Sequence, residues 1–206
     1  MAEYEIKDGV GIIPEGENKI SFCAFQNCKE LKSIVIPDSV TEIGGSAFCG
    51  CTSLTNIVIP NSVTKIGNST FEGCTSLTDF VIPDSVTEIE QGAFDGCTSL
   101  TNIVIPKTVQ KIGICAFYNC TGLISASVLG PVKLMDSTFW GCTALECVTL
   151  GVGIKKISEE AFKGCTRLRT INVPAKKADY YKKRLPEELH SLIVELPEEK
   201  KASKRK

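Results

Sequence analysis

The chain has 206 residues, of which 43% are hydrophobic and 23% charged, and its formal net charge is −1. This composition is typical of a folded globular domain and excludes a disordered chain. No apolar run approaches the roughly 18 residues of a membrane-spanning helix. Residues 1–17 have no basic region followed by an apolar stretch, so we expect no secretory signal in this chain.

Charge is unevenly distributed along the chain. Residues 1–120 carry a balance of −7, whereas residues 121–206 carry a balance of +6. A basic half can attract nucleic acid, but here the basic residues are mixed with acidic ones and no nucleic-acid-binding motif accompanies them. We therefore do not expect nucleic acid as a partner.

From the N-terminus, residues 1–13 are predicted to form a cap, with Tyr4, Ile6 and Val10 as the residues that would cover the core. Residues 14–174 are predicted to hold the repeats.

Disulfide frameworks and zinc sites cluster their cysteines at short, irregular spacings. A fixed interval of this length is instead typical of a repeat architecture. Seven of the eleven cysteines recur at intervals of 23 residues, with one interval of 22: Cys28, Cys51, Cys74, Cys97, Cys120, Cys142 and Cys165.

The other columns of the repeat keep the same period. A phenylalanine lies three residues before each of these cysteines and a leucine three residues after it. In the segment that follows Leu100, Ile103 and Ile105 point inward and Asn102 and Val104 outward, as in a strand. One such unit cannot bury its apolar side alone, so about seven repeats of 22–23 residues are expected to stack into a solenoid. The residue before each of the seven repeated cysteines is Gly or Asn, which predicts a left-handed backbone conformation there.

These columns resemble the BspA-like leucine-rich repeats of bacterial and some protist proteins, over roughly residues 10–195. The resemblance implies an α/β repeat solenoid, rich in β-structure, with a parallel β-sheet on its concave face. It also implies adhesion at the cell surface through binding of host or microbial proteins.

The seven repeated cysteines are predicted to form a structural ladder of buried free thiols, about 5 Å apart. Parallel side chains in register keep their Cβ atoms further apart than a disulfide needs. We therefore interpret Cys97 and its six equivalents as core residues rather than nucleophiles, metal ligands or disulfide partners, and we expect no metal or cofactor.

A column of charged residues lies immediately before the isoleucine on the predicted convex side of the repeats. Its signs alternate over Lys19, Glu42, Lys65, Glu88 and Lys111, and the alternation ends at Lys133 and Lys156. Opposite charges on adjacent strands stabilise a sheet. We interpret this column as a structural device that holds register and not as a binding site.

Two columns point outward from the predicted concave sheet and supply the candidate protein-binding residues. Four successive valines form an apolar stripe, which favours binding to a protein partner or to a second copy of the chain. The alternative is that valine simply suits a sheet. The candidates are Val35, Asn56, Val58, Asp79, Val81, Asn102, Val104, Ser127 and Thr149.

Residues 175–196 are predicted to cap the C-terminal end, with a helix at 178–185 that carries two tyrosines and a strand at 192–194. Proline at position 186 favours the start of a further turn. Residues 197–206 are predicted to be a disordered charged tail.

Together these features predict a non-enzymatic, adhesin-like protein-binding module. The single histidine, His190, lies in the C-terminal cap, and the sequence has no phosphate-binding glycine loop, HExxH or GxSxG motif. The alternatives are an intracellular interaction scaffold and a structural spacer of a larger protein. The resemblance implies a surface location, while the expected lack of a signal leaves the cytoplasm open.

Overall fold

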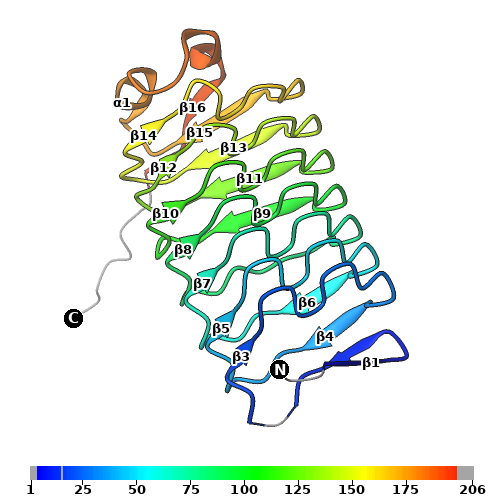
Figure 1. The fold of residues 1–206 in the computed structure, drawn as a ribbon. Coiled ribbons are helices and arrows are strands. Elements are labelled where there is room, and N and C mark those ends of the chain that lie inside the picture. Colours follow the sequence, from blue (N-terminus) through cyan, green and yellow to red (C-terminus); the bar gives the residue numbers. More distant parts are fainter. Residues whose placement is uncertain (1–3, 15, 199–206) are drawn as a thin grey trace, which may run out of the picture.

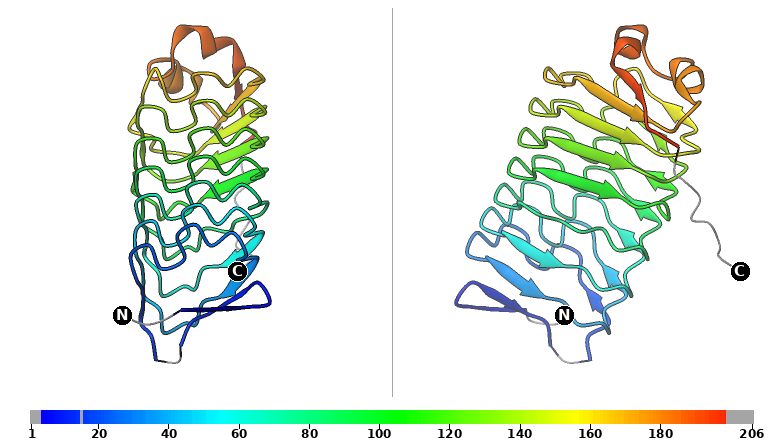
Figure 2. Two further views of the ribbon diagram at one scale, coloured as in Figure 1. Left: turned by 45° about the vertical axis from the view of Figure 1, so that its right-hand side comes forward. Right: turned by 180° about the vertical axis from the view of Figure 1, so that it is seen from behind.

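The chain winds into a β-rich solenoid of about eight turns (Figure 1). This computed structural model describes residues 4–14 and 16–198. A typical turn contributes one strand of three or four residues and one strand of two residues, which lie on different sides of the solenoid (Figure 2). Across the described ranges, no helix has the length and apolar character needed to cross a membrane.

The longer strands form where the outward and inward columns alternate, and their outward side is called here the long-strand face. They are β2 (Val10–Ile12), β4 (Ser33–Val35), β6 (Asn56–Val58), β9 (Asn102–Ile105), β11 (Ser125–Val128), β13 (Cys147–Leu150) and β15 (Thr170–Val173). The two-residue strands carry the charged column, and their outward side is the short-strand face. They are β3 (Lys19–Ile20), β5 (Glu42–Ile43), β7 (Lys65–Ile66), β8 (Glu88–Ile89), β10 (Lys111–Ile112), β12 (Lys133–Leu134) and β14 (Lys156–Ile157).

The N-terminal end is closed by a hairpin. Strand β1 (Glu5–Lys7) pairs antiparallel with β2, which in turn pairs parallel with β4. The ring of Tyr4 lies 5.1 Å from that of Phe25, and the Tyr4 hydroxyl accepts a hydrogen bond of 2.9 Å from the Ser21 amide. Val10, expected as cover, is instead 40% exposed because it points out of the sheet beside Ser33.

The long-strand sheet is interrupted in the middle of the molecule, which corrects the expectation of one continuous parallel sheet. Strands β1, β2, β4 and β6 form one sheet, and β9, β11, β13, β15 and β16 (Ile193–Glu195) form another. The intervening residues 79–82 form no strand. Whether the face that carries these strands is concave stays a prediction.

We attribute the interruption to Phe80. This residue occupies the inward column of Ile57 and Ile103, but its ring packs edge-on between two core phenylalanines. Its centroid lies 5.0 Å from that of Phe71 and 4.8 Å from that of Phe94. A phenyl ring needs more room than the isoleucine side chains above and below it, and we infer that this difference keeps residues 79–82 from pairing as a strand.

The turn after each phenylalanine has the predicted backbone. All seven Gly or Asn residues that precede a repeat cysteine have positive φ, from 52° at Asn119 to 79° at Gly164. The prediction of a left-handed residue at this position is therefore confirmed. A second left-handed column lies four residues earlier and was not expected: Cys23, Ser46, Ser69, Gly92, Cys115 and Ser137 have φ between 51° and 60°.

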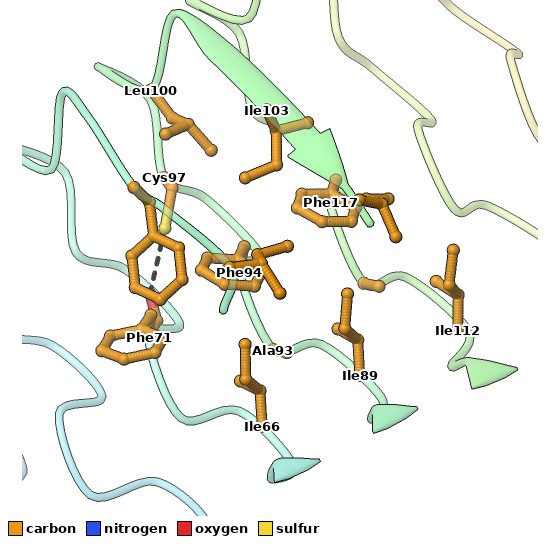
Figure 3. Packing of buried hydrophobic residues seen from close by; sticks show 14 of the residues in the cluster. Ile66, Phe71, Ile89, Ala93, Phe94, Cys97, Leu100, Ile103, Ile112 and Phe117 are labelled. Atoms are coloured by element: carbon orange, nitrogen blue, oxygen red, sulfur yellow. Dashed lines mark hydrogen bonds between the residues drawn. The ribbon is translucent and has the colours of Figure 1, made fainter. Parts of the chain in front are cut away.

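The phenylalanine column forms a continuous stack through the core. Successive rings from Phe25 to Phe162 lie 5.1–5.7 Å apart between centroids, with interplanar angles of 2–19°. Figure 3 shows Phe71, Phe94 and Phe117 of this stack, with the isoleucines of the short strands beside them. Because each turn buries its rings only against its neighbours, the core is as long as the solenoid.

The cysteine column runs beside these rings. Cys51, Cys74, Cys97, Cys120 and Cys142 are fully buried, whereas Cys28 and Cys165, at the two ends, are partly exposed. From Cys51 onward each thiol donates to the carbonyl oxygen of the phenylalanine 25 or 26 residues earlier, at 2.9–3.1 Å. The dashed line in Figure 3 marks this bond from Cys97 to Phe71. These thiols are thus hydrogen-bonded links between turns.

The C-terminal end differs from the repeats. Helix α1 (Ala178–Lys182) begins where predicted and ends three residues early, and a 3₁₀ helix (Glu187–Leu192) follows Pro186 and leads into β16. The hydroxyl groups of Tyr180 and Tyr181 donate to the carbonyl oxygens of Ile154 and Gly151 on an earlier turn. These bonds hold the helix against the end of the solenoid. Of the predicted tail, residues 199–206 lie outside the described range.

Candidate protein-binding face

Most of the nine candidate residues are exposed on the long-strand face. The side chains of Val35, Val58, Val81 and Val104 are 54–79% exposed, and Asn56, Asp79 and Asn102 are exposed beside them. Ser127 and Thr149 are half-buried. The register β4–β6 places Val35 directly beside Val58, and the register β9–β11 places Val104 beside Ser127, so the candidates lie in two groups on either side of the unpaired segment 79–82.

The apolar stripe is one residue longer than the sequence columns indicated. Ile12 follows Gly11, which pairs with Ile34, so Ile12 lies next to Val35 and is 41% exposed. We call Ile12, Val35, Val58, Val81 and Val104 the aliphatic column. The sequence columns missed Ile12 because the N-terminal hairpin departs from the repeat pattern. The alternation of Val10 and Ile12 around Gly11 could have shown that Ile12 points outward.

The second half of the same face is polar. Ser125 donates to the Asn102 side-chain oxygen at 2.7 Å, and Asn172 donates to the Thr149 hydroxyl at 3.4 Å and to the Cys147 sulfur at 3.3 Å. These groups satisfy one another across neighbouring strands. The apolar and polar halves therefore present different chemistry to a partner.

A shallow groove lies within the aliphatic column, between β6 and the unpaired segment 79–82. The groove has a volume of about 340 Å³, and its lining includes Asn56, Val58, Asn61, Asp79, Val81 and Pro83. Four of these side chains belong to the outward columns, while Asn61 and Pro83 come from the following turns. An apolar floor with a few amide and carboxylate groups at its edges is typical of a site that accepts a partner side chain.

A second hollow, which the sequence did not indicate, lies where the later strands end. It has a volume of about 790 Å³, and its lining includes the exposed aliphatic residues Leu129, Val152 and Leu196 beside Thr149. Leu129 occupies the position that proline holds at residues 14, 37, 60, 83 and 106. This replacement of proline by leucine is the signal that could have revealed the hollow.

Groups that carry chemistry are sparse. His190 Nε2 donates to the Leu185 carbonyl oxygen at 3.0 Å within the C-terminal cap. Among residues 4–14 and 16–198, no three His, Cys, Asp or Glu side chains are grouped to hold a metal ion. Burial raises the pKa of Asp95 to about 6, and the carboxylate of Glu72 adds to the effect. Asp95 lies in the turn that follows Phe94 and is not part of the aliphatic column.

The fold and this surface define a leucine-rich repeat solenoid. The repeat model described as the BspA type leucine-rich repeat region matches the chain in six copies, over residues 11–124 and 64–185. These residues span most of the chain. The chain therefore belongs to the BspA-type leucine-rich repeat proteins, a family typical of protein-interaction or surface proteins and generally without enzymatic activity.

Solved structures support the family assignment. The leucine-rich repeat protein TpLRR of T. pallidum is 30% identical, with a TM-score of 0.64 over 80% of this chain and 86% of that chain. A leucine-rich repeat protein of Eubacterium ventriosum is 24% identical, with a TM-score of 0.56 over 68% of this chain and 48% of that chain. The pneumococcal vaccine antigen PcpA, at 16% identity, shares the fold, with a TM-score of 0.73 over 95% of this chain and 48% of its own. A search of curated proteins found no match.

Proposed function

We propose that the protein is a non-enzymatic, adhesin-like binding module that holds a protein partner against its long-strand face. The observation that carries the proposal is the aliphatic column, in which four successive valines are 54–79% exposed. Exposure of valine side chains to water is unfavourable in free energy, so a column of them favours burial by a partner. The groove beside Val81 gives that column a depression in which an anchoring side chain can be enclosed.

Family membership supports a surface role, because BspA-type repeats are typical of surface and interaction proteins. We therefore take proteins of the extracellular matrix and of host or microbial surfaces as the partner class. A dimer of two copies through the aliphatic column, an intracellular scaffold and a structural spacer are the outcomes against which the proposal is tested.

The test is a binding screen of the intact chain against purified matrix and cell-surface proteins. The variant Val58→Lys/Val81→Lys/Val104→Lys is expected to bind its partner at least about tenfold more weakly, because three buried ammonium groups oppose the contact. A matched control, Thr41→Lys/Thr64→Lys/Thr87→Lys, adds the same charge to the other side of the solenoid and is expected to bind normally.

Equal partner binding by both triple variants, with unchanged thermal unfolding, would contradict the proposal. A wild-type chain that binds none of the proteins would favour the spacer. If the wild type sediments as a dimer and the valine variant as a monomer, the column binds a second copy instead.

A further inference from the structure

Asp79 is the one charged residue in the outward columns of the repeats on the long-strand face. The outward residues of the paired strands β4, β6, β9, β11, β13 and β15 are all uncharged, and Asp79 begins the unpaired segment between β6 and β9. Its side chain is exposed and accepts a hydrogen bond of 3.4 Å from the neighbouring Thr78 hydroxyl. Within the described part of the chain it forms no ion pair. The chain itself therefore does not neutralise this carboxylate.

Charges on the short-strand face are arranged differently. The ammonium nitrogen of Lys19 lies 2.7 Å from a carboxylate oxygen of Glu42 on the next turn. That of Lys65 lies 2.7 Å from Glu90, which lies just outside the predicted charged column. Charges that connect neighbouring turns thus have partners on those turns. Asp79 has no such partner, so holding register does not account for it.

Asp79 lines the groove on the long-strand face, which has a volume of about 340 Å³. Val58 and Val81, which are 70% and 79% exposed, supply apolar surface to the same groove. The side chains of Asn56 and Asn61 add two amide groups. An apolar surface beside a carboxylate and two amide oxygens is complementary to a side chain with an aliphatic stem and several N–H donors at its end.

Arginine fits this chemistry better than lysine does. Its guanidinium group presents five N–H donors in a fixed plane and pairs with a carboxylate through two parallel bonds, whereas the ammonium group of lysine is compact and more strongly hydrated. The methylene stem can pack on apolar surface while the charged end stays at the edge of the groove. Arginine is also enriched among the residues that anchor protein interfaces.

We propose that the groove binds an arginine side chain of the protein partner, with its stem against Val58 and Val81 and its guanidinium group paired with Asp79. This inference rests on the protein-binding role proposed above, because it names the residue type by which a partner docks on the long-strand face. The aliphatic column supplies apolar contact, and Asp79 selects which partner can make that contact.

The test uses N-acetylarginine amide as the probe and follows the backbone amide signals of the intact, isotope-labelled protein by NMR. The probe is expected to shift the signals of Val58, Asp79 and Val81 and to saturate in the millimolar range, because a single side chain in a shallow groove binds weakly. N-acetylcitrulline amide has nearly the same shape without the charge. It is expected to bind at least about threefold more weakly.

Two variants assign the preference for arginine to Asp79 and to its place in the groove. Asp79→Asn is expected to bind the two probes alike, and it fits the repeat because asparagine holds the same column at Asn56 and Asn102. The matched control, Asp79→Asn/Asn102→Asp, keeps the net charge and moves the carboxylate one turn along the column. It is expected to lose the preference as well. Unchanged thermal unfolding of both variants checks that they fold.

Wild-type protein without saturable shifts, equal affinity of the wild type for both probes, or a preference retained by Asp79→Asn would overturn the proposal. Recovery of the preference in the double variant would show that any carboxylate on this face attracts the cation, and the assignment to the groove would fail. The probe experiment needs no partner, so its failure is distinct from failure of the protein-binding role. A partner that binds Asp79→Asn as tightly as the wild type, but not the triple valine variant, leaves that role standing and overturns the arginine inference.

Discussion

At the scale of single residues, the left-handed position before each cysteine decides how one turn becomes the next. Gly96 has φ of 68°, and a Cβ atom added there would meet nothing closer than 3.8 Å, so its constraint is backbone conformation rather than space. We expect Gly96→Asn to cost less than about 1 kcal/mol of unfolding free energy, because Asn119 already occupies this position. Gly96→Val is expected to cost about 2 kcal/mol or more. Urea denaturation measures both, and equal costs would contradict the argument.

The second left-handed column shows what residue patterns miss. Serine and cysteine have no special preference for positive φ, so the small side chains at Cys23, Ser46 and Ser69 gave no sign of it. The conformation is held by bonds between turns: the amides of these residues donate to the carbonyl oxygens of Gly45, Asn68 and Gln91 at 2.8–3.1 Å. A sequence pattern registers side-chain type, whereas this feature depends on backbone partners about 22 residues away.

At the scale of elements, Phe80 separates two sheets that would otherwise be continuous. We expect the amides of residues 79–82 to exchange with solvent much faster than those of β9, since they form no ladder. Phe80→Ile restores the aliphatic column of the repeat and is expected to slow exchange at these amides. It also removes two edge-to-face ring contacts worth about 0.5–1.5 kcal/mol each. Hydrogen-exchange mass spectrometry tests this, and unchanged exchange in the variant would show that Phe80 does not cause the break.

The same comparison shows how far elements can be predicted. The period of the cysteine, phenylalanine and leucine columns correctly predicted the repeat family, the alternation of the strands and the start of helix α1. The interruption was not predicted because phenylalanine and isoleucine both count as inward apolar residues in a pattern. Only their shapes within the ring stack distinguish them. The groove beside Val81 also escaped prediction, because a residue pattern does not register the depth of a surface.

At the scale of the whole molecule, the thiol ladder links stability to pH along the full length of the solenoid. Burial raises the pKa of Cys51 to about 12 from an ordinary value of 9.0, and the pKa of Cys74 and Cys97 is raised by the same cause. Between pH 9 and 12 the unfolded chain releases these protons while the folded chain keeps them. Folded protein then binds more protons than unfolded protein, so stability is complete below about pH 9 and is lost as pH rises.

The predicted effect is large because several thiols act together. Each thiol that stays protonated only in the folded state lowers the unfolding free energy by up to about 1.4 kcal/mol per pH unit. We expect urea denaturation under reducing conditions to show a steep decline between about pH 9 and 11. Cys51→Ala/Cys74→Ala/Cys97→Ala is expected to be less stable at pH 7, because it leaves small cavities, but to decline less steeply above pH 9. The variant keeps every lysine and tyrosine, so these groups titrate alike in both proteins. Parallel declines would show that the thiols are not protonated inside the folded solenoid, and the interpretation of the cysteine column as an inert core would then fail.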